Sequence, residues 1–179
     1  MKARTTVLLI GMFAMLAMLG VVVAEPASVD IADDPIINPL DGSTVTTTTV
    51  TITNISWSLG DPQTRTICVI TSDPNLYARV TGNDANGNPV DTGFTNDNRV
   101  CAQWVADSSV ATTYTFTLEV KGTSPGLITV SDNYGTTYSD NPAQDTASAT
   151  RPVEIPEFVT MAIPAALALL AGLFVLRRR

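Results

Sequence analysis

The stretch Tyr114 to Val120, "YTFTLEV", alternates apolar and polar residues at every step. Its apolar side chains fall on one face: Tyr114, Phe116, Leu118 and Val120. Its polar side chains fall on the other: Thr115, Thr117 and Glu119. A period of two is the pattern of an antiparallel strand with one buried face. The stretch therefore predicts a sheet that lies on a hydrophobic core.

Short runs rich in Val, Ile, Thr and aromatic residues recur on both sides of this strand. They are Val50–Leu59, Thr64–Ile70, Leu76–Val80, Arg99–Val105 and Leu127–Val130. Turn sequences such as "GDP", "SDPN", "GNDANGN" and "TSPG" separate them. No ten-residue stretch in this middle part has helical periodicity. We expect an all-β fold, a single Ig-like antiparallel β-sandwich of about seven strands over residues 43–138.

The buried parity changes within one of these runs. Val50 and Ile52 share one face, whereas Ile55 and Trp57 fall on the other, so we expect a β-bulge at Asn54. Asn54 also begins the only N-glycosylation sequon of the chain, "NIS". A bulged asparagine that faces solvent is a suitable acceptor, and Asn54 is our predicted glycosylation site.

Both ends of the chain are hydrophobic. At the N-terminus, Lys2 and Arg4 precede an apolar run, and small residues precede Glu25. This pattern predicts a signal peptide over residues 1–24 that signal peptidase removes after Ala24. A retained N-terminal anchor is the alternative.

The C-terminal apolar run covers residues 159–176 and would rise roughly 27 Å as a helix at about 1.5 Å per residue. Three arginines, 177–179, follow it directly, and such clusters stay cytoplasmic. We expect a transmembrane helix over 159–176, with the preceding domain outside the cell.

This tail combines "IPEF" at 155–158, an apolar span that carries "AIP" at 162–164, and a terminal arginine cluster. The layout resembles the PEF-CTERM sorting tail of archaeal surface proteins, over about the last 27 residues. The resemblance implies that Pro156, Glu157 and Phe158 are the recognition motif of an archaeosortase. It also implies that the tail, 155–179 with its apolar span, is removed and the new C-terminus joined to a lipid. A plain single-span anchor needs the same apolar length and arginines but has no use for "PEF".

The exported part is strongly acidic. All seventeen acidic residues lie between Glu25 and Glu157, against five basic ones, which gives a net charge of −12. Such a surface repels polyanions, so we expect no nucleic-acid partner.

The chain has two cysteines, Cys68 and Cys101, and no histidine. In an exported domain, two cysteines on strands predict a disulfide, although two buried thiols are the alternative. Without histidine, neither a zinc shell around this pair nor a histidine-based catalytic triad can form. We therefore expect that the protein is not an enzyme.

The loop "NDANGNPVD" is the candidate metal site. It could offer calcium the oxygens of Asp84, Asn86, Asn88 and Asp91. The alternative is a hairpin turn around Asn86 and Gly87, with side-chain oxygens bonded to backbone amides. We expect no other cofactor.

The two flanks of the sandwich are polar. Residues 139–154 are rich in Ser, Thr, Asp and Pro and are predicted to be a stalk. Residues 25–42 form an N-terminal extension, either flexible or a strand that inserts into a neighbouring copy.

Together these features predict a membrane-anchored cell-surface protein with an extracellular domain and a structural or adhesive role in the envelope. Expected partners are signal peptidase and archaeosortase during maturation, the membrane, and envelope proteins or further copies of the chain. One alternative is a secreted carbohydrate-binding module or carbohydrate-active enzyme with a sugar platform of Trp57, Trp104 and the tyrosines. Another is a subunit of a surface filament assembled by strand addition.

Overall fold

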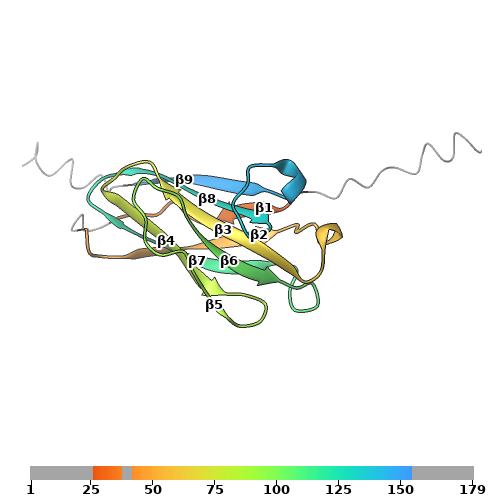
Figure 1. The fold of residues 1–179 in the computed structure, drawn as a ribbon. Coiled ribbons are helices and arrows are strands. Elements are labelled where there is room, and N and C mark those ends of the chain that lie inside the picture. The colour runs from red at the N-terminus through yellow and green to blue at the C-terminus, as the bar shows by residue number, and fades with distance from the viewer. Residues whose placement is uncertain (1–25, 38–41, 155–179) are drawn as a thin grey trace, which may run out of the picture.

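The computed structural model describes residues 26–37 and 42–154 and shows nine strands in this part of the chain (Figure 1). The strands are β1 (Ser28–Ile31), β2 (Thr46–Thr53), β3 (Gln63–Thr71), β4 (Leu76–Asn83), β5 (Pro89–Asp91), β6 (Val100–Ala106), β7 (Tyr114–Gly122), β8 (Gly126–Tyr134) and β9 (Ala147–Val153). Two short 3-10 turns, η1 (Trp57–Leu59) and η2 (Pro142–Gln144), complete the secondary structure of the described residues.

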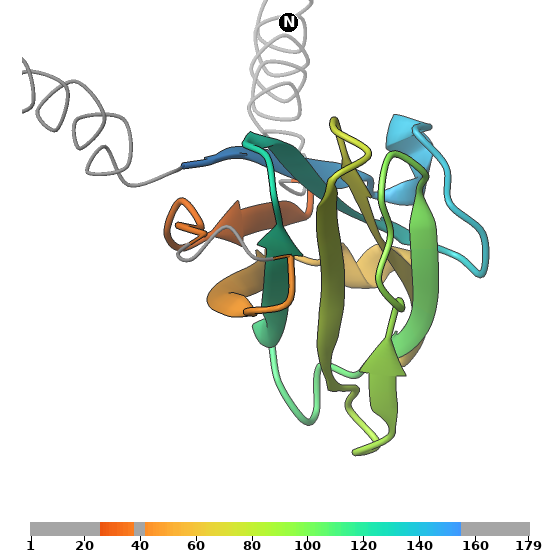
Figure 2. The same cartoon turned by 90° about the vertical axis from the view of Figure 1, so that its left-hand side faces the viewer.

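The strands form two antiparallel sheets, which confirms the all-β sandwich (Figures 1 and 2). One sheet has five strands in the order β1-β2-β7-β4-β5, and the other has four in the order β6-β3-β8-β9. Six of the nine strands match the runs named from the sequence, and β1, β5 and β9 are additional paired strands, so the count exceeds the expected seven.

Strand β7 lies at the centre of the five-stranded sheet, between β2 and β4. Its alternation is as the sequence predicts, since the four apolar side chains are buried and Thr115 and Thr117 are exposed. Trp104 of β6 crosses the sandwich and packs on Tyr114 and Phe116, with ring centroids 4.9 and 5.2 Å apart. Each large apolar side chain buried here contributes about 1.5–3 kcal/mol, so this contact fixes the two sheets to one another.

The predicted stalk over 139–154 is wrong for its last part. Residues 147–153 form β9, which pairs with β8 along its whole length, from Ala147 opposite Asp132 to Val153 opposite Gly126. The strand escapes pattern recognition because its inward positions hold alanines and an arginine before Val153. The first part of the predicted stalk also packs on the domain, since the Ser139 N–H donates to Asn133 Oδ1 at 3.3 Å and Asp145 is buried.

The N-terminal extension contains β1, which pairs with β2 of its own sheet. Val29 and Ile31 of this strand are buried in the core. In this structure, residues 28–31 therefore form a strand that pairs within their own chain.

The bulge expected at Asn54 is also wrong. Strand β2 ends at Thr53, and Asn54 takes the left-handed conformation with φ of 56°. Asparagine tolerates this conformation better than most residues, so the chain turns here. Ile55 then enters the core, which accounts for the change of parity.

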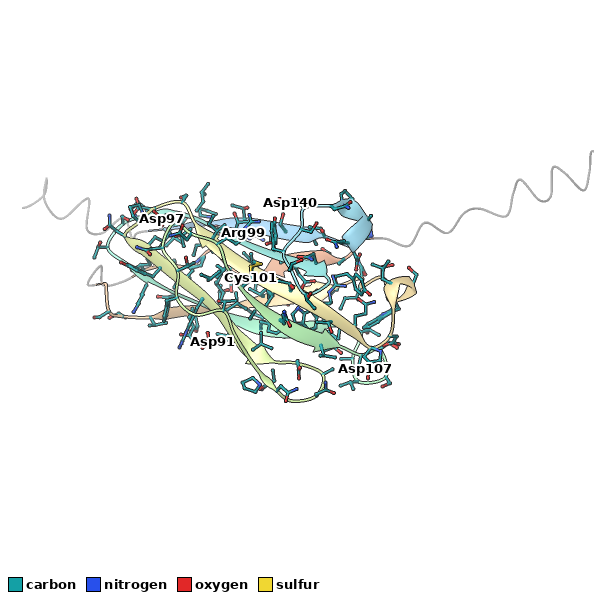
Figure 3. All side chains as sticks on the ribbon, in the orientation of Figure 1. Asp91, Asp97, Arg99, Cys101, Asp107 and Asp140 are labelled. Atoms are coloured by element: carbon teal, nitrogen blue, oxygen red, sulfur yellow. A yellow bond between two sulfur atoms is a disulfide. The ribbon has the colours of Figure 1, made fainter. Side chains whose placement is uncertain are left out.

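The sandwich has two ends, named here from one residue at each. The Asn54 end carries residues 54–62, 84–88, 107–113 and 135–146. The Glu154 end carries Glu154 and residues 36–37, 42–45, 72–75, 97–99 and 123–125. In Figure 3, the labels of Asp107 and Asp97 mark the Asn54 and the Glu154 end, respectively.

The signal peptide 1–24, the sorting motif Pro156, Glu157 and Phe158, and the span 159–176 lie outside the described residues. Among residues 26–37 and 42–154, no helix has the length and apolarity to cross a bilayer.

Candidate functional site

A fully buried polar network lies between the sheets near the Asn54 end. Its centre is Arg65 on β3, whose side chain has no exposed surface. The Arg65 Nε donates to Asp132 Oδ2 at 2.8 Å, and Nη2 lies 2.7 Å from the same oxygen. Nη1 donates to Gln63 at 2.9 Å and to Asp145 Oδ2 at 3.0 Å. All three guanidinium nitrogens therefore have acceptors, as a buried charge requires.

Strands β3 and β8 place the two central charges. In their antiparallel register, Ile67 lies opposite Asp132 and Arg65 opposite Tyr134, so Arg65 and Asp132 are diagonal neighbours on the inward face. The indole Nε1 of Trp104 donates to the second oxygen of Asp132 at 2.8 Å. The same tryptophan thus packs the core and satisfies the buried carboxylate.

Asp145 joins the network to three chain segments. It follows η2 in a left-handed conformation with φ of 49°. Its Oδ1 accepts a hydrogen bond from the Ala27 N–H at 2.7 Å, and its Oδ2 accepts one from the Ser56 N–H at 2.9 Å. Asp145 therefore holds the start of the N-terminal segment, the β2–β3 connection and Arg65 together.

Burial raises the pKa of the Asp132 carboxyl to about 6, although the charge and hydrogen bonds of Arg65 and the Trp104 N–H act in the opposite direction. A raised carboxyl pKa is common in active sites, but Asp132 is fully buried and its two oxygens are occupied. No substrate can reach it in this structure. The network is therefore a structural element of the core.

A small pocket of about 150 Å³ lies over Asp145. Its walls are Pro26, Ser56, Leu59, Pro142 and Ala143. This volume is smaller than the roughly 300–1,000 Å³ of typical small-molecule pockets.

The Cys68–Cys101 disulfide is confirmed. The two residues lie directly opposite each other in the β3–β6 register, with Cα atoms 4.1 Å apart. The bond therefore joins neighbouring strands of one sheet and lies on that sheet's outer face, where Figure 3 labels Cys101. With a sequence separation of 33 between the cysteines, the bond stabilises the fold by roughly 3–4 kcal/mol in the chain-entropy model.

The structure gives the candidate calcium ligands other partners. Asp84 Oδ1 accepts hydrogen bonds from the Asn86 and Asn88 N–H groups, at 2.9 and 2.8 Å. Asp91 lies on β5, with its carboxylate 3.6 Å from the Arg79 guanidinium. Within the described residues, no three His, Cys, Asp or Glu side chains gather where they could hold a metal. The geometry of residues 84–88 is that of the hairpin turn.

The two tryptophans do not form an exposed pair. Trp104 is 1% exposed and belongs to the core, whereas Trp57 is half-buried in η1. Trp104 therefore cannot stack on a sugar at the surface, and the exposed tryptophan pair that the carbohydrate alternative requires is not present. Asn54, in contrast, is exposed and accessible for glycosylation.

A second charged cluster, which sequence reasoning missed, lies on the outer face of the five-stranded sheet. Arg79 on β4 donates to Glu119 on β7 at 2.9 Å, and this bond raises the pKa of the guanidinium. Arg79 also lies 4.6 Å from the ring centroid of Phe94, and Lys121 Nζ lies 4.4 Å from it. Two of the five basic residues that lie between Glu25 and Glu157 thus meet at one phenylalanine.

No protein-family model matches this chain, and no curated protein matches it. Among solved structures, a conjugative transposon lipoprotein from Bacteroides eggerthii is similar at 11% identity with a TM-score of 0.41, over 72% of this chain and 97% of that one. The collagen-binding domain of a Staphylococcus aureus adhesin is similar at 12% identity with a TM-score of 0.34, over 73% and 97%. The Enterococcus faecalis protein ACE, which binds its ligands by the collagen hug model, is similar at 12% identity with a TM-score of 0.33, over 63% and 46%. Similarity at this level says nothing about function.

Proposed function

We propose that this Ig-like sandwich is an exported surface domain, attached to the cell envelope through its C-terminal segment, with a structural or adhesive role. One observation carries the proposal: the sandwich described over residues 26–37 and 42–154 lies between the two apolar ends of the sequence, and its backbone pairing reaches Glu154, two residues before Pro156. In this proposal, one acidic, disulfide-linked domain lies between an N-terminal and a C-terminal targeting segment.

The interior supports a scaffold role. The buried carboxylate with the raised pKa is enclosed and bonded on both oxygens, so it serves the fold. The surface is acidic and carries an exposed sequon at Asn54, which suits a solvated envelope component.

For the anchor, we propose that "PEF" at Pro156, Glu157 and Phe158 directs an archaeosortase to remove the apolar tail. The motif, the apolar span and the three arginines support this proposal by their order and spacing. The filament alternative, in which β1 is donated to a neighbouring copy, needs β1 to leave β2 and the core positions of Val29 and Ile31.

Intact mass spectrometry of the protein from its native envelope tests the sorting step. We expect a chain that begins at Glu25 and ends near Pro156, with added lipid mass. Reduction should add about 2 Da, because two thiols replace the disulfide. As a control, replacing Pro156, Glu157 and Phe158 by alanine keeps the apolar span and should leave a chain that ends at Arg179.

A native protein that itself ends at Arg179 would overturn sorting and leave a permanent membrane span. A native protein that lacks both the span and a lipid would overturn anchoring altogether.

A further inference from the structure

The folded domain is fixed up to the residue where the tail begins. The Glu154 N–H donates to the Pro35 carbonyl at 3.0 Å, and the Glu154 carbonyl accepts from the Ile37 N–H at 3.1 Å. This parallel bridge follows directly on the β8–β9 ladder. Residues up to Glu154 are therefore held in the domain and cannot serve as a flexible spacer between it and the tail.

The connection to the apolar run is very short. Residues 155–158 separate Glu154 from Val159, and four residues span at most about 14 Å at roughly 3.4 Å each. A nine-residue strand such as β7 is about twice as long, at about 3.4 Å per residue. A sandwich held by this connection cannot stand clear of the membrane that holds the tail.

The end that would meet the membrane carries exposed apolar side chains. Ile36 is 49% exposed, Val45 is 42% exposed and Leu127 is 50% exposed. Ile36 bridges Glu154, Leu127 lies opposite Pro152 at the end of β9, and the Thr46 hydroxyl next to Val45 donates to the Ile36 carbonyl. All three thus lie at the Glu154 end, which faces the viewer in Figure 2.

We propose that the Glu154 end lies on the membrane surface, with Ile36, Val45 and Leu127 in the headgroup region of the lipid. This inference rests on the proposed C-terminal attachment and adds the orientation of the domain. Apolar side chains that insert at an interface add to the binding that a single anchor supplies. The Asn54 end, with the sequon, then points away from the cell.

Charge selects the kind of lipid surface. Asp33, Asp34 and Glu154 are exposed beside Ile36 and repel anionic headgroups. Arg151 is the basic residue of β9, and its guanidinium already lies 3.4 Å from the Asp30 carboxylate and 3.9 Å from the Asp34 carboxylate. The partner that this end fits is therefore an interface of uncharged or zwitterionic headgroups.

Spin-label accessibility of the chain from Glu25 to Arg179 in phosphatidylcholine vesicles tests the inference. A single cysteine is introduced in place of Leu127, or of Val110 at the opposite end, and labelled with a nitroxide without reducing agent. Val110 is 60% exposed and serves as the matched position. We expect the label at 127 to be severalfold less accessible to a water-soluble nickel complex than the label at 110.

A second comparison uses the apolar residues themselves. The label is placed on a cysteine that replaces Pro74, which is also exposed at the Glu154 end. The double variant Ile36→Ser, Leu127→Ser should make this label more accessible to the nickel complex than it is without the two substitutions, while the protein still floats with the vesicles. Val110→Ser should change nothing.

Equal accessibility at 127 and 110 in a protein that floats with the vesicles would overturn the orientation and leave the attachment intact. A protein that does not float would overturn both. Protection at 127 that is stronger in vesicles with anionic lipid would overturn the choice of an uncharged or zwitterionic surface.

Discussion

Two arginines of this sandwich have the same kinds of partners in opposite surroundings. Arg65 lies between the sheets and forms ion pairs with Asp132 and Asp145. Asp132 in turn accepts a hydrogen bond from Trp104. Arg79 lies on an outer face with Glu119, Asp91 and Phe94, and its side chain is 32% exposed. Water can replace every partner of Arg79, whereas it can replace none of those of Arg65. Burial, rather than the number of ion pairs, therefore decides how much such a cluster contributes to stability.

Replacing the buried arginine should have the largest effect. Arg65→Met leaves two carboxylates buried without their cation, which should lower the free energy of unfolding by about 3–5 kcal/mol. Chemical denaturation of the disulfide-linked protein measures this loss. If Arg65→Met lowers the free energy of unfolding by less than about 1 kcal/mol, as is usual for surface ion pairs, the buried and the exposed arginine contribute alike and the prediction is wrong.

Removal of the carboxylate that links segments should come next. Asp145→Ala leaves the N–H groups of Ala27 and Ser56 without their acceptor, at about 1–3 kcal/mol for a buried unsatisfied group. Hydrogen exchange should increase first at these two amides, with the central strands unaffected. Asp140→Ala, an exposed carboxylate of the same connection, is the control and should leave the exchange of both amides unchanged.

The pH dependence of stability should differ between the wild type and Asp132→Asn. Because burial raises the pKa of folded Asp132 from 3.8 to about 6, the folded state holds a proton that the unfolded state has lost between these values. The contribution of this group to stability is thus present below about pH 4 and decreases as the pH rises to 6, by at most about 1.4 kcal/mol per pH unit. Unfolding curves between pH 4 and 7 should show this decrease only in the wild type. Parallel profiles would mean that Arg65 and Trp104 outweigh burial.

The exposed arginine should give the smallest effect. Arg79→Met should lower the free energy of unfolding by less than about 1 kcal/mol, because the pair with Glu119 is solvated. High salt should shrink even this difference, as it screens surface charge. An effect of Arg79→Met that is large and independent of salt would show that the outer cluster behaves like the inner one.

The sequence predicts the strands whose alternation is strong and misses those whose side chains are small. Strand β7 alternates without exception, and its central place in the sheet follows from that pattern. In β9, the inward positions before Val153 hold Ala147, Ala149 and Arg151, so no hydrophobic period marks the strand. Its partner β8 supplies the contacts that make it a strand, and such tertiary information is absent from a local pattern.

The buried network left a trace in the sequence. Arg65 has the same parity as Ile67 and Val69, and Asp132 has the same parity as Ile128 and Val130. Opposite charges at inward positions of two strands indicate a buried pair once the strands are known to be neighbours. Asp145 had no such signal, because its role depends on a turn that brings it back to residues 27 and 56.

The place of β9 as the last paired strand before Glu154 also determines how the described domain bears mechanical load. Backbone hydrogen bonds in an antiparallel ladder lie across the strands. Tension between an anchor after Glu154 and a ligand held at the Asn54 end would pull β9 along its own axis. The seven residue pairs that join β9 to β8 would then share the force in shear, instead of opening one after another. Force spectroscopy in this direction should record one high rupture force, whereas a low force with gradual lengthening would show that β9 peels away.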